Sequence, residues 1–170
     1  NKAVMDLYQD YLSVYTMDDM EEGILENCNL IIVGQNNCPL IRELIEKKEI
    51  TPCQKAQGYT ARIADSVWNP EKQMVVIAGA DTYGTLYGCV DFVNQYCGVL
   101  VYRSELVVDD MHKEYFEVPF KEKIPEWNVT TAPAVAERGI WTWGHVIYDY
   151  RQFFENMLKL KMNEVVIWND

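Results

Sequence analysis

The chain has 170 residues, of which 49% are hydrophobic and 12% aromatic, enough to bury the core of one domain and a little more. Its 15 basic and 26 acidic residues give a formal charge of -11 at pH 7. Because this charge repels phosphate backbones and anionic lipids, nucleic acids and membrane surfaces are excluded as favoured partners. The binding of a neutral ligand such as a sugar does not depend on this charge.

No membrane span is expected, because the longest uncharged apolar run, Met74 to Ala80, is far shorter than the roughly 20 residues that cross a bilayer. The chain opens with Asn1, as either a processed N-terminus or a cloning boundary would give. The location we expect is secreted or periplasmic.

The cysteines do not form a metal-binding pattern. There are five of them, with no Cys-x-x-Cys pair and only two histidines, so neither a metal nor another cofactor is expected. Cys89 and Cys97 flank an apolar helical pattern and are expected to be small buried side chains. The sequence leaves open whether a disulfide forms, and with five cysteines at least one thiol is unpaired within the chain.

The first elements in chain order are a helix, a strand and a second helix. Apolar residues at helical spacing predict a helix over 3–12, and the acidic stretch 18–22 predicts a solvated connection. Leu30 to Val33 is a β-branched apolar run and predicts a short buried strand. Pro39 begins a helix that fades after Ile45.

A hairpin and a longer helix follow. Residues 58–64 alternate as a strand, Asn69-Pro70 predicts a turn, and 74–77 predict the returning strand. The segment after Gly79 leads into a helix that extends to Tyr96. Three further short strands are expected at 99–102, 106–108 and 115–118.

The strand, glycine turn and helix start between Val75 and Gly88 are the layout of a phosphate-binding loop as well as of ordinary packing. The glycine spacing does not fit G-x-G-x-x-G. We favour the interpretation in which Asp81 or Thr82 caps the helix, while Gly84 and Gly88 let the helix lie close to the sheet.

The composition of the sequence changes over 121–134, which contains two prolines and Trp127, and we interpret this stretch as a linker. Before it, 1–120 are expected to form an accessory α+β domain, a mixed β-sheet with packed helices. After it, 135–170 read as a strand, an amphipathic helix and a buried strand, which together form a βαβ unit. These three elements are expected at 135–143, 148–161 and 164–168. The helix is expected to face inward through Phe153, Phe154, Met157, Leu158 and Leu160.

The residues of both regions resemble known families. Val75 to Gly88 resembles the domain that precedes the barrel in β-N-acetylhexosaminidases and α-glucuronidases. Ala136 to Ile140, Asp149 to Arg151 and Met157 to Asp170 resemble the opening of those barrels, with an Arg-Gly strand and a helix that ends in Lys-Met-Asn. The resemblance covers roughly 28–103 and 134–170. It implies an accessory domain followed by the first βαβ unit of a (β/α)8 TIM barrel.

The resemblance also implies a glycoside hydrolase acting on poly- or oligosaccharides. In a TIM barrel the reacting groups stand at the C-terminal ends of the strands, and aromatic rings there suit the apolar faces of sugars. Arg138 matches a strand-one arginine that holds a sugar hydroxyl in the hexosaminidases, although a buried arginine paired with a barrel carboxylate is equally consistent. The side chains expected to bind substrate are Arg138, Trp141, Trp143, His145, Trp168, Asn169 and Asp170.

Two departures from the family pattern bear on function. Residues 141–145 occupy the place of the Asp-x-x-Arg of the hexosaminidases, so specificity for acetamido sugars is not implied. The catalytic carboxylates of these families come from later strands, so we expect no catalytic residue in this chain and no activity from it alone. The alternatives are a stand-alone carbohydrate-binding or interaction module and, third, a nucleotide-binding domain.

Overall fold

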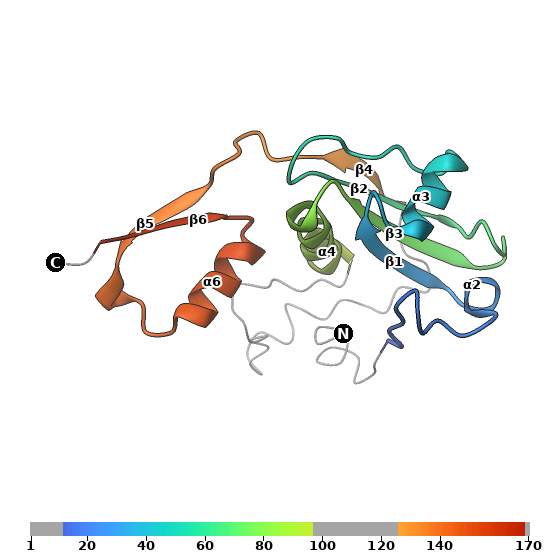
Figure 1. Cartoon of the computed structure of the whole chain (residues 1–170), viewed down its shortest axis with the longest axis horizontal. Helices are drawn as coiled ribbons and strands as arrows, with labels where there is room; N and C mark the ends of the chain where they lie inside the picture. The colour runs from blue at the N-terminus through green and yellow to red at the C-terminus, as the bar shows by residue number, and fades with distance from the viewer. Residues whose placement is uncertain (1–11, 97–125, 169–170) are drawn as a thin grey trace.

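The computed structural model describes residues 12–96 and 126–168, which form two sheets (Figure 1). The first is a four-stranded sheet in the order β1-β3-β2-β4, and the second is a two-stranded sheet, β5-β6. The elements are α2 (Ile24–Asn27), β1 (Leu30–Gln35), α3 (Pro39–Glu46), β2 (Tyr59–Asp65), β3 (Gln73–Gly79), α4 (Thr82–Tyr96), β4 (Asn128–Thr131), β5 (Gly139–Trp143), η1 (Gly144–Val146), α6 (Tyr150–Lys159) and β6 (Glu164–Trp168).

The four-stranded sheet is mixed, as predicted. β1 runs parallel to β3, whereas β2 is antiparallel to both β3 and β4. The predicted hairpin is confirmed, because β2 and β3 are neighbours joined through the turn that contains Asn69. The N–H group of Lys72 closes this turn on the carbonyl oxygen of Asn69 at 2.9 Å.

Helices cover both faces of this sheet, and β3 is buried from Met74 to Gly79. α3 packs against one face through Ile41 and Leu44, while α4 packs against the other through Tyr87 and Phe92. A strand covered on both faces needs apolar residues at every position rather than at alternate ones, which is why β3 reads as a continuous apolar run.

Asp81 and two glycines determine how α4 lies on the sheet. The carboxylate Oδ1 of Asp81 accepts the backbone N–H of Gly84 at 2.8 Å, so Asp81 caps the helix as predicted. A Cβ atom at Gly84 would collide with the carbonyl oxygen of Gly58, and one at Gly88 would lie 2.5 Å from Cγ2 of Ile77. The close approach predicted for these glycines is confirmed. The N–H of Gly84 already donates to the side chain of Asp81.

The second sheet has the connectivity predicted for a βαβ unit. β5 and β6 are parallel and are joined through η1 and α6. Asp149 caps α6, since its side chain accepts the N–H of Gln152 at 3.0 Å. Within the described residues this sheet has two strands and is not closed into a barrel.

Three details of the predicted βαβ unit are wrong. The first strand begins at Gly139 rather than at 135, because the carbonyl oxygen of Ala136 bonds to the side chain of Gln57, in the loop before β2, and not to a neighbouring strand. Phe154 and Leu160, expected to face inward, are 40% and 51% exposed. β6 is not a buried strand: it alternates between exposed and half-buried positions, since α6 covers only one face of the pair.

The segment expected as a linker, 121–134, contains part of the first sheet. Residues 128–131 form β4, and Trp127 is buried against Tyr59 and Phe92. The other predicted elements, the helix at 3–12 and the strands at 99–102, 106–108 and 115–118, lie outside the described residues, as does Cys97. The short helix α2 was not predicted.

None of the helices in the described part of the chain is both long and apolar enough to cross a membrane.

The close approach of α4 to the loop before β2 predicts a penalty for any side chain at position 84. The Gly84→Ala substitution should lower the free energy of unfolding by about 1–3 kcal/mol, because the methyl group meets backbone atoms that cannot rotate away. Urea denaturation measures this change. Thr82→Ala, at the exposed start of the same helix, is the control and should change stability by less than about 0.5 kcal/mol. Helix propensity alone would make Gly84→Ala more stable by up to about 1 kcal/mol, and that result would contradict the packing argument.

Candidate functional site

Three of the predicted substrate-binding residues lie together on one face of the β5–β6 pair. Trp141, Trp143 and Trp168 are 73%, 46% and 50% exposed. Trp143 lies opposite Trp168 in the strand register, and their ring centroids are 6.3 Å apart at an interplanar angle of 80°. Val166, opposite Trp141, belongs to the same face and is 48% exposed. We call these four residues the tryptophan face.

The remaining predicted residues are distributed differently. His145 lies in η1, directly after β5. Asn169 and Asp170 lie outside the described residues. Arg138 directly precedes β5, whereas Trp143 is the last residue of that strand, so the two lie about 17 Å apart along it.

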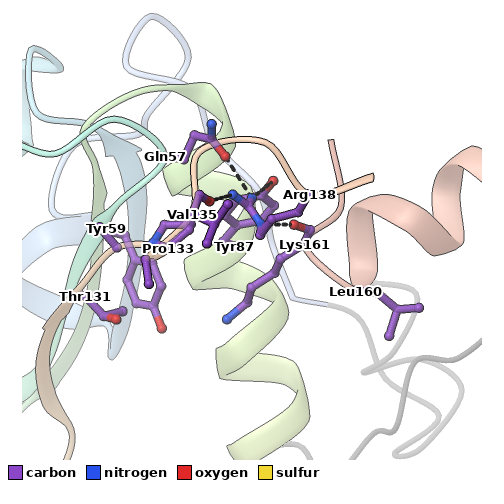
Figure 2. A pocket seen from close by; sticks show the side chains of 11 residues that line it. Gln57, Tyr59, Tyr87, Thr131, Pro133, Val135, Arg138, Leu160 and Lys161 are labelled. Carbon is purple, nitrogen blue, oxygen red and sulfur yellow. Dashed lines mark hydrogen bonds between the residues drawn. The ribbon is translucent and has the colours of Figure 1, made fainter. Parts of the chain in front are cut away.

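The guanidinium group of Arg138 has a protein acceptor for each of its five N–H groups. Nε donates to the carbonyl oxygen of Lys161 at 2.6 Å. Nη1 donates to the carbonyl oxygens of Val135 and Ala136 at 2.6 and 3.1 Å. Nη2 donates to Oε1 of Gln57 at 2.8 Å and to the hydroxyl of Tyr87 at 2.9 Å. Arg138 thus makes hydrogen bonds to segments next to the first sheet and to segments next to the second (Figure 2). None of these acceptors is a carboxylate.

Asn163, which precedes β6, makes a second connection between the loop before β2 and the β5–β6 pair. Its Nδ2 donates to Oε1 of Gln57 at 3.1 Å and to the carbonyl oxygen of Ala136 at 2.8 Å. Its Oδ1 accepts the backbone N–H of Arg138 at 2.8 Å. The backbone N–H of Asn163 in turn donates to the carbonyl oxygen of Arg138 at 2.9 Å, so the starts of β5 and β6 are fastened to one another.

An ion pair forms the third connection. Nζ of Lys161 lies 2.6 Å from Oδ2 of Asp91 on α4, and the hydroxyl of Tyr59 donates to the same carboxylate oxygen. Lys161 and Gln57 both have left-handed backbone conformations, with φ of 59° and 61°. Such conformations are uncommon for side chains other than glycine and persist where surrounding contacts fix them. We call Gln57, Tyr87, Asp91, Arg138, Lys161 and Asn163 the junction.

Tyr87 is the buried member of the junction. Burial raises the pKa of its phenol above the ordinary value of 10.0, and the charge of Arg138 offsets part of that rise. The guanidinium carbon of Arg138 lies 5.5 Å from the centre of the Tyr87 ring, where the ring attracts the cation. The phenol therefore stays neutral at physiological pH and serves Arg138 as an acceptor.

A cavity of about 550 Å³ opens beside the junction (Figure 2). Its walls come from the loop before β2, from α4, from the segment after β4 and from the end of α6. The lining residues are Gln57, Tyr59, Tyr87, Thr131, Ala132, Pro133, Ala134, Val135, Arg138, Leu160 and Lys161.

The carboxylates at and beside the junction are engaged in contacts within the protein. Asp91 is paired with Lys161, and Asp81 caps α4. In the part of the chain that the structure describes, no three His, Cys, Asp or Glu side chains gather in a way that could hold a metal ion. The tryptophan face presents its ring surfaces to solvent.

Comparisons with known proteins show a likeness among solved structures. No protein-family model and no curated protein matches the chain. Among solved structures, the chain is similar to part of a 4-O-methyl-α-glucuronidase of family GH115 with specificity for decorated arabinogalactans. The two are 21% identical with a TM-score of 0.47, over 81% of this chain and 19% of that one. The chain therefore spans about a fifth of that protein, and a likeness of this size does not establish a shared family.

The sequence pointed to only part of the junction. Arg138 and Asn163 belong to the stretches that resemble the barrel opening, but nothing in those stretches indicates that the two side chains contact Gln57. Gln57 and Asp91 carried no signal, because an isolated glutamine before a glycine and an aspartate inside an apolar helix are both common on protein surfaces. Pairings over 81 and 70 residues are set by tertiary structure.

The hydrogen bonds of Arg138 predict that it matters for stability. Arg138→Ala leaves Tyr87, Gln57 and three carbonyl oxygens without this donor and should lower the free energy of unfolding by about 2–3 kcal/mol in urea denaturation. Arg151→Ala is the matched control. Its side chain is 89% exposed and pairs with Glu155 on the helix surface, so it should cost under about 0.5 kcal/mol. Equal effects of the two substitutions would contradict the assigned role.

Cys89 on α4 is expected to be a poor nucleophile. Desolvation by burial raises the pKa of its thiol above 9.0, so the reactive thiolate is scarcer in the folded protein than in the unfolded one. Alkylation at pH 9, followed by mass spectrometry, should label Cys89 several-fold more slowly in native protein than in urea. The difference should shrink as the pH rises through the folded-state pKa. Equal labelling rates at pH 9 would show that burial does not protect the thiol.

Proposed function

We propose that the chain is the N-terminal, non-catalytic portion of a glycoside hydrolase that acts on poly- or oligosaccharides. In this proposal 1–120 form the accessory α+β domain, to which β4 adds an edge strand, and 135–170 begin a (β/α)8 barrel. The catalytic carboxylates would come from later strands. A secreted or periplasmic location belongs to the same proposal.

The half-covered β5–β6 pair carries the proposal. Parallel sheets occur almost only with both faces buried, because their crossover helices cover one face and other elements cover the second. Here α6 covers one face, while the tryptophan face is exposed to solvent. A two-stranded parallel sheet with three exposed tryptophans is suited to continuation by further strands, as in a barrel whose interior is filled by side chains.

The ends of the strands support a carbohydrate ligand. Trp143 and Trp168 are the last residues of β5 and β6, and a barrel binds its substrate at this end of its strands. Indole rings pack against the apolar face of a pyranose, and they do so irrespective of the protein's negative charge. Binding of a sugar hydroxyl by Arg138 remains a prediction, and it would require the exchange of at least one bond within the junction.

A second candidate is a carbohydrate-binding module that acts without a barrel. The observation in its favour is the tryptophan face itself, which presents aromatic rings to solvent. The tryptophans outside the βαβ unit do not add to it: Trp127 is 6% exposed, and Trp68 is half-buried with Nζ of Lys47 lying 5.5 Å from its ring centre.

Activity separates the two candidates. The longer protein that continues beyond Asp170 should cleave aryl glycosides or oligosaccharides, whereas the 170-residue chain should show no turnover above background. The matched assay titrates neutral oligosaccharides into the 170-residue chain by calorimetry. Tight binding by the chain, together with no activity in any longer product, would favour the module and contradict the proposed function.

A further inference from the structure

We propose that Gln57 is a positioning residue that fixes the β5–α6–β6 unit on the four-stranded sheet. In this role Arg138 and Asn163 are docking groups that recognise the amide of Gln57. The inference concerns contacts within this chain and does not depend on the proposed glycosidase activity.

The amide of Gln57 bonds entirely to the β5–α6–β6 side. Its Oε1 accepts from Nη2 of Arg138 at 2.8 Å and from Nδ2 of Asn163 at 3.1 Å. Its Nε2 donates to the carbonyl oxygen of Ala136 at 3.0 Å. Acceptor and donor are both needed here, and a primary amide is a side-chain group that supplies both without a charge.

The first unit holds Gln57 ready for these bonds. Its backbone N–H donates to Oδ2 of Asp81 at 2.7 Å, while the other oxygen of that carboxylate caps α4. The N–H of Ala80 donates to the carbonyl oxygen of Gly58 at 2.9 Å, which fastens the same loop to the end of β3. The left-handed backbone of Gln57 is thus fixed by contacts that do not involve β5 or β6.

The position of the contact suits a docking role. Arg138 precedes β5 and Asn163 precedes β6, so Gln57 meets the N-terminal ends of both parallel strands. In barrels this end serves stability, while the opposite end binds substrate. Docking here leaves the ends at Trp143 and Trp168 unobstructed by the first sheet, and directional hydrogen bonds fix the angle between the two units.

Hydrogen exchange followed by mass spectrometry tests the role. Gln57→Ala should speed exchange of the β5 and β6 amides by about tenfold or more, while the amides of β1 and β3 keep their wild-type rates. Gln57→Glu retains the acceptor for Arg138 but sets a carboxylate oxygen against the carbonyl oxygen of Ala136, so its exchange rates should lie between those of the wild type and of Gln57→Ala. Gln35→Ala is the matched control, because Gln35 ends β1 and makes one exposed side-chain bond, to Thr82 at 3.2 Å.

The outcomes are distinct. Unchanged exchange of β5 and β6 in Gln57→Ala would overturn the inference, and so would a uniform increase over all strands, which indicates general destabilisation. A Gln57→Glu variant as unprotected as Gln57→Ala would show that the shared acceptor is not what positions the unit. Absence of glycosidase activity in a longer protein would leave this result standing, so the two proposals fail separately.

Discussion

The hydrogen bonds around one guanidinium group connect the two halves of this chain. Arg138 gives all five of its N–H groups to acceptors drawn from the loop before β2, from α4 and from the segments that flank β5 and β6. A planar cation with five fixed donors can do this, whereas a lysine has three donors on a flexible stem. To supply these acceptors, α4 must lie close enough to present Tyr87, and Gln57 must hold a left-handed backbone.

The two ends of the β5–β6 pair differ in their contacts. The bonds of the junction engage the start of each strand, and the exposed rings of Trp143 and Trp168 lie at the other end, about 13 Å away. Fixing one end on the first sheet and presenting aromatic surface at the other fits the accessory domain and barrel opening that we propose. α4 lies between the two units and contributes to both (Figure 1).

The sequence was informative where local chemistry decides structure. The apolar run of β3, the cap at Asp81, the close-packing glycines and the βαβ connectivity all follow from short-range patterns, and each is confirmed. The burial of Phe154, Leu160 and β6 was predicted wrongly, because a pattern specifies which face is apolar and not what covers it. Residues 128–131 were assigned to a linker because an edge strand with four residues carries little periodic signal. The role of Gln57 depends on partners about 80 or more residues away, which no local pattern encodes.

We propose above that the tryptophan face belongs to an interior that further strands complete. Hydroxyl-radical footprinting resolved by mass spectrometry measures it directly, by comparing oxidation of Trp141 in this chain with that in the longer protein. Trp127, which is buried in this chain, serves as the internal reference. We expect Trp141 to be oxidised readily in this chain and several-fold more slowly in the longer protein. Equal oxidation in the two would contradict it, because the face would then be a solvent-exposed surface in its own right.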